Sequence, residues 1–84
     1  MTEKKLVEVR ARMSGVFYRS PAPDQPPFVE VGARVKKKQT LALMETMKVF
    51  QKIKSPTEGT VVEIAVENEA TIKDDDLLFV IEAG

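Results

Sequence analysis

The chain has 84 residues, which is room for one small domain with one modest hydrophobic core. Thirteen Lys and Arg residues balance thirteen Asp and Glu residues, so no net charge draws the chain to nucleic acid or to an anionic membrane. The chain has no Cys and no His, which excludes disulfides, thiol nucleophiles, imidazole bases and nearly every structural zinc site. We therefore expect a chain without catalytic residues and without a metal site.

Short runs rich in β-branched and aromatic residues recur along the chain. In order they are residues 6–10, 15–18, 28–31, 49–53, 60–64 and 77–81. Each is a strand signal, and turn residues separate them at intervals of roughly ten residues. No window carries a 3.6-residue apolar stripe over three turns. The sequence therefore predicts a single all-β domain over residues 1–84, built as a small barrel or sandwich.

The chain also repeats itself. With a shift of 37, six of the seventeen residues from Val29 to Glu45 are identical to those from Val66 to Glu82. Composition alone predicts about one identity. Upstream the shift becomes 44 and aligns Gly15 with Gly59. The first half therefore holds seven extra residues (44 minus 37) between Gly15 and Val29.

The extra residues fall in a proline-rich segment, residues 18–27, which contains four of the five prolines. Proline fixes φ and has no amide donor, so we expect a stiff loop that projects from the repeated scaffold. One interpretation is a neutral surface insertion, because loops accept insertions at small cost. The other is a contact role, because a stiff loop has little entropy to lose on binding.

The two halves, about residues 5–45 and 49–84, leave only residues 46–48 between them. Two similar β halves usually pack about a pseudo-twofold axis. The link at 46–48 should then lie at the end of the molecule opposite the two termini. This arrangement places Lys48 at a tight tip.

The residues around Lys48 are unusual for a turn. Met47 precedes it and Val49 and Phe50 follow, where turn chemistry favours Gly, Asn or Asp. A lone lysine in a turn is usually a solvated charge, and the apolar neighbours could belong to the core. Strand alternation lets only every second side chain point inward, however, so part of the cluster must be exposed. Exposed apolar side chains at a tip indicate recognition.

Residues 43–49, LMETMKV, resemble the Glu-Ala-Met-Lys-Met attachment motif of biotinyl domains. Residues 7–82 are similar to the biotinyl carrier domains of acetyl-CoA carboxylases. Residues 15–24, GVFYRSPAPD, look like the "thumb" insertion of those carriers. The sequence is thus identified as a member of the biotin/lipoyl attachment family.

The resemblance implies a flattened barrel of two four-stranded antiparallel sheets, with biotin bonded covalently to the amine of Lys48. It implies recognition by a biotin protein ligase or other partner through Glu45, Met47 and Val49. It also implies a thumb that leans towards the biotin and is formed by Ser20, Pro21, Ala22, Pro23 and Asp24. The implied function is to carry a carboxyl group from biotin carboxylase to a carboxyltransferase, with acetyl-CoA as the acceptor in fatty acid synthesis.

The motif departs from the family pattern at Thr46 and Val49, where Ala and Met are usual. The Glu-Thr pair resembles lipoyl domains, in which Asp commonly precedes the modified lysine. Met47 and the thumb favour biotin. Two alternatives stay open: a lipoyl carrier domain of a 2-oxoacid dehydrogenase-type complex, and an unmodified structural β-barrel.

The repeated turn of the family usually has Gly where this chain has Lys38 and, in the second half, Asp75. Lysine tolerates positive φ less readily than Asp does. We therefore expect local strain or a different shape at the first turn.

Other sites are weakly supported. The basic run Lys36–Lys38 is offset by its repeat mate, which contains Asp74–Asp76, so we expect no nucleic-acid binding. Consecutive carboxylates in a turn cannot all face one ion, so we expect no calcium site at Asp74–Asp76. An exposed lysine amine is almost entirely protonated near neutral pH, and the chain has no His to deprotonate it. A separate ligase must therefore supply the base and the activated biotinyl ester.

Charge is scattered through residues 1–15, where a secretory signal needs an unbroken apolar run. The uncharged stretches are too short for a membrane span. We therefore predict a cytoplasmic protein without a membrane partner, and a plastid or another organelle stays open.

Overall fold

The computed structural model describes residues 5–84. Within that range the strands are β1 (Lys5–Arg10), β2 (Gly15–Tyr18), β3 (Arg34–Val35), β4 (Thr40–Thr46), β5 (Val49–Lys54), β6 (Gly59–Ile64), β7 (Thr71–Ile72) and β8 (Leu77–Ala83). Turns and loops join them, which confirms the all-β prediction. Nothing helical in this range has the length and apolar character of a membrane span.

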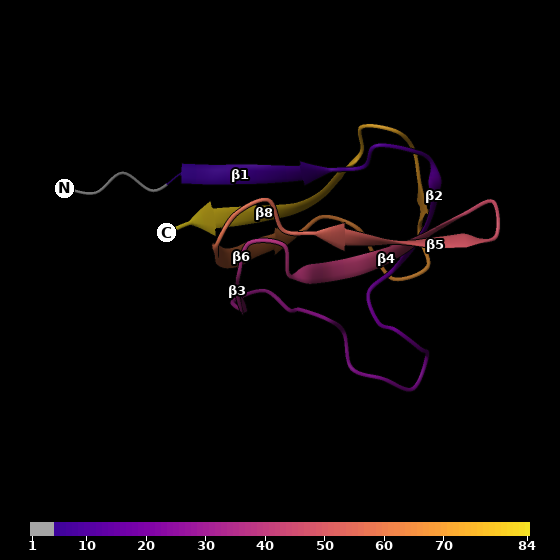
Figure 1. Cartoon of the computed structure of the whole chain (residues 1–84), viewed down its shortest axis with the longest axis horizontal. Coiled ribbons are helices and arrows are strands. Elements are labelled where there is room, and N and C mark those ends of the chain that lie inside the picture. Colours follow the sequence, from indigo (N-terminus) through magenta and orange to yellow (C-terminus); the bar gives the residue numbers. More distant parts are fainter. Residues whose placement is uncertain (1–4) are drawn as a thin grey trace.

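The strands form two four-stranded antiparallel sheets, in the orders β1-β8-β6-β3 and β5-β4-β2-β7 (Figure 1). Under the shifts of the sequence repeat, each strand of one sheet has its equivalent at the same place in the other. The pairs are β1 with β5, β8 with β4, β6 with β2 and β3 with β7. The predicted pair of sheets related by a pseudo-twofold axis is confirmed.

The backbone hydrogen bonds at the turns follow the same symmetry. The amide of Lys38 donates to the carbonyl of Ser55 at 2.8 Å. The amide of Asp75 donates to the carbonyl of Ala11, also at 2.8 Å. The donors are 37 residues apart (75 minus 38) and the acceptors are 44 apart (55 minus 11). Both shifts found in the sequence therefore correspond to the same pseudo-twofold rotation.

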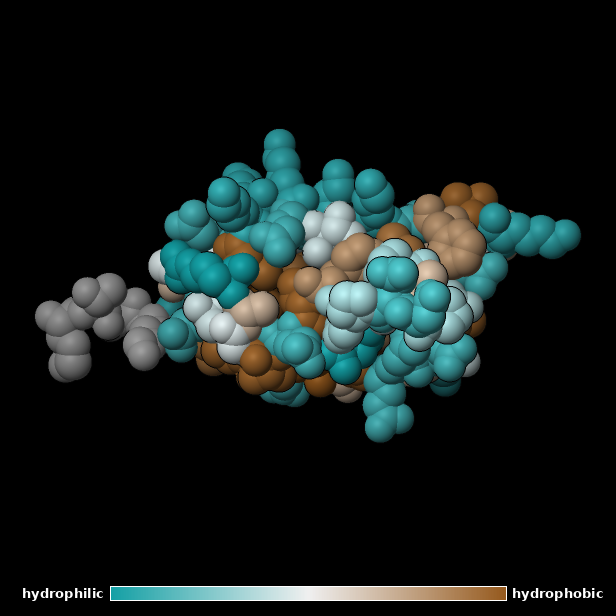
Figure 2. Space-filling view, turned by 90° about the horizontal axis from the view of Figure 1, so that it is seen from below, coloured by the Kyte–Doolittle hydropathy of each residue, from teal (hydrophilic) through white to brown (hydrophobic). Residues whose placement is uncertain are grey.

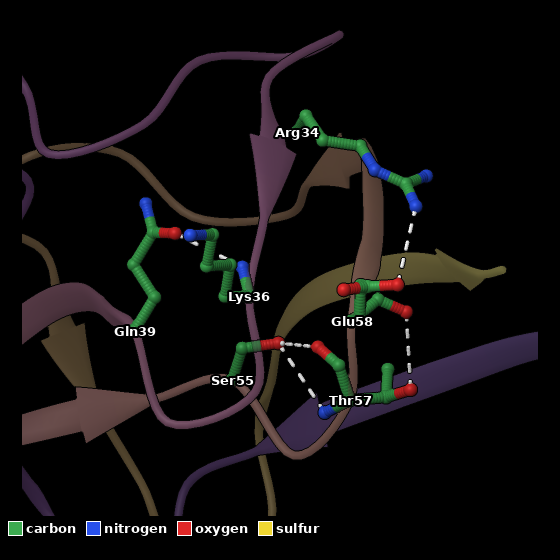
Figure 3. Close-up of polar contacts among 6 residues, drawn as sticks. All are labelled: Arg34, Lys36, Gln39, Ser55, Thr57 and Glu58. Carbon is green, nitrogen blue, oxygen red and sulfur yellow. Dashed lines mark hydrogen bonds and ion pairs between the residues drawn. The ribbon is translucent and has the colours of Figure 1, made fainter.

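One side chain closes each of these turns. Gln39 Oε1 accepts a hydrogen bond from the amide of Lys36 at 2.9 Å (Figure 3). Asp76 Oδ2 accepts one from the amide of Lys73 at 2.8 Å. Beside the first turn, the buried hydroxyl of Ser55 donates to a backbone carbonyl two residues further on, at 2.6 Å. Asp76 is therefore used as a turn cap, which fits a solvated turn at Asp74–Asp76.

The turn at Lys38 keeps the shape of its counterpart. Lys38 has a φ of 72° and Asp75 a φ of 74°, both in the left-handed region. That region costs an L-residue roughly 1–2 kcal/mol, whereas glycine enters it freely. The structure thus confirms strain at Lys38 and excludes a different turn shape.

Apolar side chains from both halves fill the space between the sheets. At its centre the rings of Phe17 and Phe79 pack at a tilt of 50°, with centroids 5.8 Å apart. The surrounding buried side chains are Val9, Ala11, Val29, Val35, Leu41, Ala42, Met44, Val61, Ile72, Leu78 and Ile81. The two sheets therefore share one core, and the β4–β5 hairpin projects beyond it (Figure 1).

The predicted strands are wrong at residues 28–31 and miss β3, β4 and β7. Residues 28–31 form no strand: the amide of Phe28 donates to the carbonyl of Arg19 at 2.8 Å, and Val29 is buried. Phe28 and Val29 instead anchor the end of the proline-rich loop in the core, whereas Val31 is exposed. The strand signals also miss β4, because its Leu-Ala-Leu-Met run has a helical preference that pairing with β2 and β5 overrides.

The start of β1 and the C-terminus lie far from the hairpin. β1 begins beside the end of β8, where Lys5 pairs with Ala83. Both lie at the left of Figure 1, whereas the β4–β5 hairpin forms the right-hand tip. The predicted position of residues 46–48 is therefore confirmed.

Candidate functional site

Met47 and Lys48 are the two central residues of a tight hairpin. Thr46 and Val49 form the last pair between β4 and β5, so only two residues remain in the turn. Their φ angles are 48° and 68°, and positive φ at both positions is typical of a type I′ turn, which favours Asn-Gly. Each costs roughly 1–2 kcal/mol in this conformation. Met47 and Lys48 destabilise the turn relative to Asn-Gly, so their presence indicates a role other than stability.

The side chains around the tip are strongly exposed for apolar residues. Met47 is 96% exposed, Val49 56% and Phe50 57%, whereas Met44 is 3% exposed and belongs to the core. In Figure 2, apolar side chains gather at the end of the molecule that carries the hairpin, beside a hydrophilic side chain that projects from that end. The expectation that only part of this cluster is buried is confirmed.

Lys48 itself is exposed, so its amine is accessible to another protein. Glu45 lies three residues before it, half-buried, and pairs across the hairpin with Phe50. Glu45, Met47 and Val49 are within three residues of Lys48 in the sequence, and all four residues belong to the β4–β5 hairpin. A primary amine in this position is suited to forming an amide bond with a carboxylic acid.

The proline-rich loop between β2 and β3 folds back over one sheet. Residues 20–23 line a pocket of about 360 Å³ together with Leu43 of β4 and Phe50 of β5. Asp24 is exposed and is not among the lining residues. The structure thus brings Ser20, Pro21, Ala22 and Pro23 towards the hairpin, and leaves Asp24 on the outside.

Hydrogen bonds fix the loop at its base. The Phe28 amide bond to the Arg19 carbonyl closes it, and the amide of Gln25 donates to the carbonyl of Ala22 at 3.1 Å within it. The amide of Arg19 donates to Asn68 Oδ1 at 2.9 Å. These hydrogen bonds and the four prolines give the loop a defined conformation.

Comparison with known proteins identifies the family. Residues 7–81 match the model of the biotin/lipoyl family, described as "Biotin-requiring enzyme". This chain belongs to the biotin/lipoyl attachment family. It is 44% identical over 80 residues to the chloroplastic biotin carboxyl carrier protein of acetyl-CoA carboxylase 1 of Arabidopsis thaliana, covering 95% of this chain and 29% of that protein. It is 46% identical over 66 residues to the biotin carboxyl carrier protein of acetyl-CoA carboxylase of Nostoc sp., covering 79% and 36%.

This member of the biotin/lipoyl family thus spans about a third of the length of those relatives. Among solved structures it is similar to a single-chain, multi-domain long-chain acyl-CoA carboxylase, with a TM-score of 0.81, 18% identity, and coverage of 100% of this chain and 8% of the other. It is also similar to the Kluyveromyces lactis urea carboxylase, with a TM-score of 0.75, 21% identity, and coverage of 96% and 6%. At these sequence identities, the two similarities establish a shared fold only.

The sequence interpretation misses one contact of this family member. The hydroxyl of Tyr18 donates to Glu45 Oε1 at 3.1 Å, and its ring lies 5.9 Å from that of Phe50 at a tilt of 49°. The hydrogen bond to Glu45 raises the pKa of Tyr18 above its usual value of 10, and partial burial and the negative charges of Glu45 and Glu69 raise it further. With a shift of 44, Tyr18 aligns with Val62, so the sequence shows that the tyrosine belongs to one half only but does not show what it contacts.

Proposed function

We propose that this chain is the biotin-bearing domain of a biotin carboxyl carrier protein, with biotin attached to Lys48. The observation that carries the proposal is an exposed lysine in a strained two-residue turn, preceded by an almost fully exposed methionine, in a chain of the biotin/lipoyl family. The names of the relatives support acetyl-CoA as the carboxyl acceptor, and hence a role in fatty acid synthesis.

The residues present fit this cofactor. The Lys48 amine can attack the carbonyl carbon of an activated biotinyl ester and displace its leaving group, which leaves an amide bond. The amine must first lose a proton, and because the chain has no His, the ligase supplies the base. When bound, biotin supplies the ureido nitrogen that carries the carboxyl group. The chain holds the attachment point on a rigid tip, where tethering replaces diffusional encounter with a high effective concentration.

The partners follow from this role. A biotin protein ligase modifies the domain, a biotin carboxylase loads it and a carboxyltransferase unloads it, so the chain itself is non-catalytic. Likeness of fold to multi-domain carboxylases supports carboxylase partners. The relatives are chloroplastic and bacterial carriers, which supports a bacterial cytoplasm or a plastid as the compartment.

The surface that the ligase reads is proposed to be Glu45, Met47 and Val49 around the lysine. Apolar exposure at Met47 and Val49 gives a contact area, and the carboxylate gives a charged anchor. Residues 20–23 of the thumb would restrict the orientations of the arm once biotin is attached, since they face the hairpin across the pocket.

The mass of the protein isolated from its native host tests the assignment, because biotinyl, lipoyl and unmodified chains differ in mass. We expect one biotinyl group per chain. Co-expression with a biotin ligase, followed by peptide mapping, should place it on Lys48. A lipoyl group, or biotin on another lysine, would disprove the proposal.

Met47→Asp tests the lipoyl alternative. A carboxylate before the lysine is the mark of the sister family, so biotinylation should slow markedly, and lipoylation by a lipoate ligase should become detectable. Because Met47 is almost fully exposed, the melting temperature should change little. Initial rates of biotin transfer measure the effect, with Met13→Asp on a loop outside the hairpin as the control. An unchanged rate would mean that the ligase reads another feature.

Deletion of residues 20–26 tests the thumb. It removes seven residues and gives the first half the loop length of the second, so the barrel should fold and still accept biotin. Carboxylation by biotin carboxylase should become severalfold slower, and NMR relaxation should show a more mobile biotin ring. A deletion variant that does not fold would make the loop structural. One with unchanged carboxylation and mobility would make it a neutral insertion.

A further inference from the structure

Tyr18 joins the base of the thumb to both strands of the hairpin. It is the last residue of β2 and pairs with Leu43 on β4. From there its hydroxyl reaches Glu45, two residues closer to the tip, while its ring contacts Phe50 on β5. The next residue, Arg19, begins the thumb and is tied by its amide to Asn68. One half-buried side chain therefore contacts both partners of the Glu45–Phe50 cross-strand pair.

The repeat shows that the fold does not require this arrangement. Under the two shifts, the residue equivalent to Glu45 is Glu82 (45 plus 37). The equivalents of Tyr18 and Phe50 are Val62 (18 plus 44) and Leu6 (50 minus 44). Both halves keep the glutamate, but the tyrosine hydroxyl and the contact between two aromatic rings occur only at the end that carries Lys48.

We propose that Tyr18 is a positioning residue that holds Glu45 and Phe50 in the arrangement read by the biotin ligase beside Lys48. This inference rests on the proposed function. Tyr18 does not touch the reacting amine. It acts through Glu45, whose carboxylate it orients three residues before the modified lysine.

The physical basis is preorganisation. A glutamate side chain that is free to rotate loses rotamer entropy when a binding partner fixes it, and that loss weakens binding. In this chain the tyrosine hydroxyl already fixes the carboxylate through a charge-assisted hydrogen bond. The Phe50 ring packs against the tyrosine ring on the same face. The ligase therefore meets a carboxylate whose direction is set before binding.

Steady-state kinetics of a biotin ligase with biotin and ATP test the proposal. Tyr18→Phe keeps the ring and removes the hydroxyl, so we expect KM for the domain to rise roughly three- to tenfold with kcat nearly unchanged. In a Glu45→Ala background, the same substitution should have no further effect. Glu82→Ala, the equivalent change at the far end of the barrel, is the matched control and should leave both constants unchanged.

A spectroscopic readout is independent of biotin. Tyr18 is the only tyrosine and the chain has no tryptophan, so tyrosinate absorbance reports this residue alone. Glu45 and Glu69 are the charged groups that act on it. We expect Glu45→Ala to lower the pKa of Tyr18 towards its ordinary value, and Glu82→Ala to leave it unchanged.

Three results would overturn the proposal: wild-type kinetics for Tyr18→Phe, fully additive effects of Tyr18→Phe and Glu45→Ala, or a tyrosine pKa that is unaffected by Glu45→Ala. A loss of rate caused only by a less stable fold would appear as additive effects. Failure of the proposed function gives a different result, because the wild-type chain would then not be biotinylated at Lys48 while the tyrosine titration kept its dependence on Glu45.

Discussion

Lys48→Arg should abolish biotinylation completely while the melting temperature moves by no more than a degree or two. Arginine keeps the positive charge, but its delocalised guanidinium is not an acyl acceptor for the ligase. The side chain at this position is exposed, and both residue types pay the same cost for a φ of 68°. Intact mass after co-expression with a biotin ligase measures the first effect, and thermal unfolding measures the second.

Lys52→Arg is the matched control for this variant. Lys52 is also an exposed lysine and lies on β5, four residues from Lys48, but in regular strand conformation outside the turn. It should be labelled at the wild-type rate. Biotin found on Lys48→Arg would show that another lysine is the acceptor, and a large drop in stability would show that Lys48 has a structural role.

The sequence repeat predicts most of the fold because its two shifts have a direct spatial meaning. Lys36 and Lys73 align with a shift of 37, and each donates its amide to the side chain three residues later. Gly15 and Gly59 align with a shift of 44 and occupy equivalent close contacts. The glycine identity marks a position where the backbone leaves no room for a side chain, and the aligned lysines mark the same turn in both halves, so a comparison within one chain is informative.

The strand errors arise where tertiary context overrides local preference. Residues 28–31 fit a strand by composition, but Phe28 and Val29 instead return the thumb to the core, and this depends on a loop of irregular conformation. β4 has the composition of a helix and becomes a strand because it lies between β2 and β5. Neither outcome is encoded in a short window of sequence.

The candidate site also has one part that the sequence predicts and one part that depends on tertiary structure. The tip could be predicted, because a Met-Lys pair at the junction of two repeats depends only on counting residues. The contact between Tyr18 and Glu45 could not, because these residues are 27 apart and meet only if Tyr18 pairs with Leu43. A slip of one residue in that register would turn the tyrosine to the other face of the sheet.

Gly15→Ala should destabilise the domain by roughly 1–3 kcal/mol, a large share of the several kcal/mol expected for a chain of this size. A Cβ at this position would lie 2.5 Å from the carbonyl oxygen of Glu45 and 2.8 Å from Cγ2 of Thr46. The carbonyl cannot turn away without breaking the pairing of β2 with β4. We expect the melting temperature to fall by roughly 4–8 °C for each kcal/mol, as measured by thermal unfolding.

The same substitution should also disturb modification, because the displaced residues lead directly into the turn at Lys48. Gly59→Ala is the matched control: its Cβ would meet the carbonyl of Glu82, the equivalent of Glu45, at the end of the barrel away from the lysine. Both variants should be destabilised to a similar degree, but per folded molecule only Gly15→Ala should be biotinylated more slowly. Equal biotinylation rates would mean that the ligase does not depend on the exact position of the strand before the turn. A fully stable Gly15→Ala would mean that β2 and β4 can separate at no cost, against the close packing seen here.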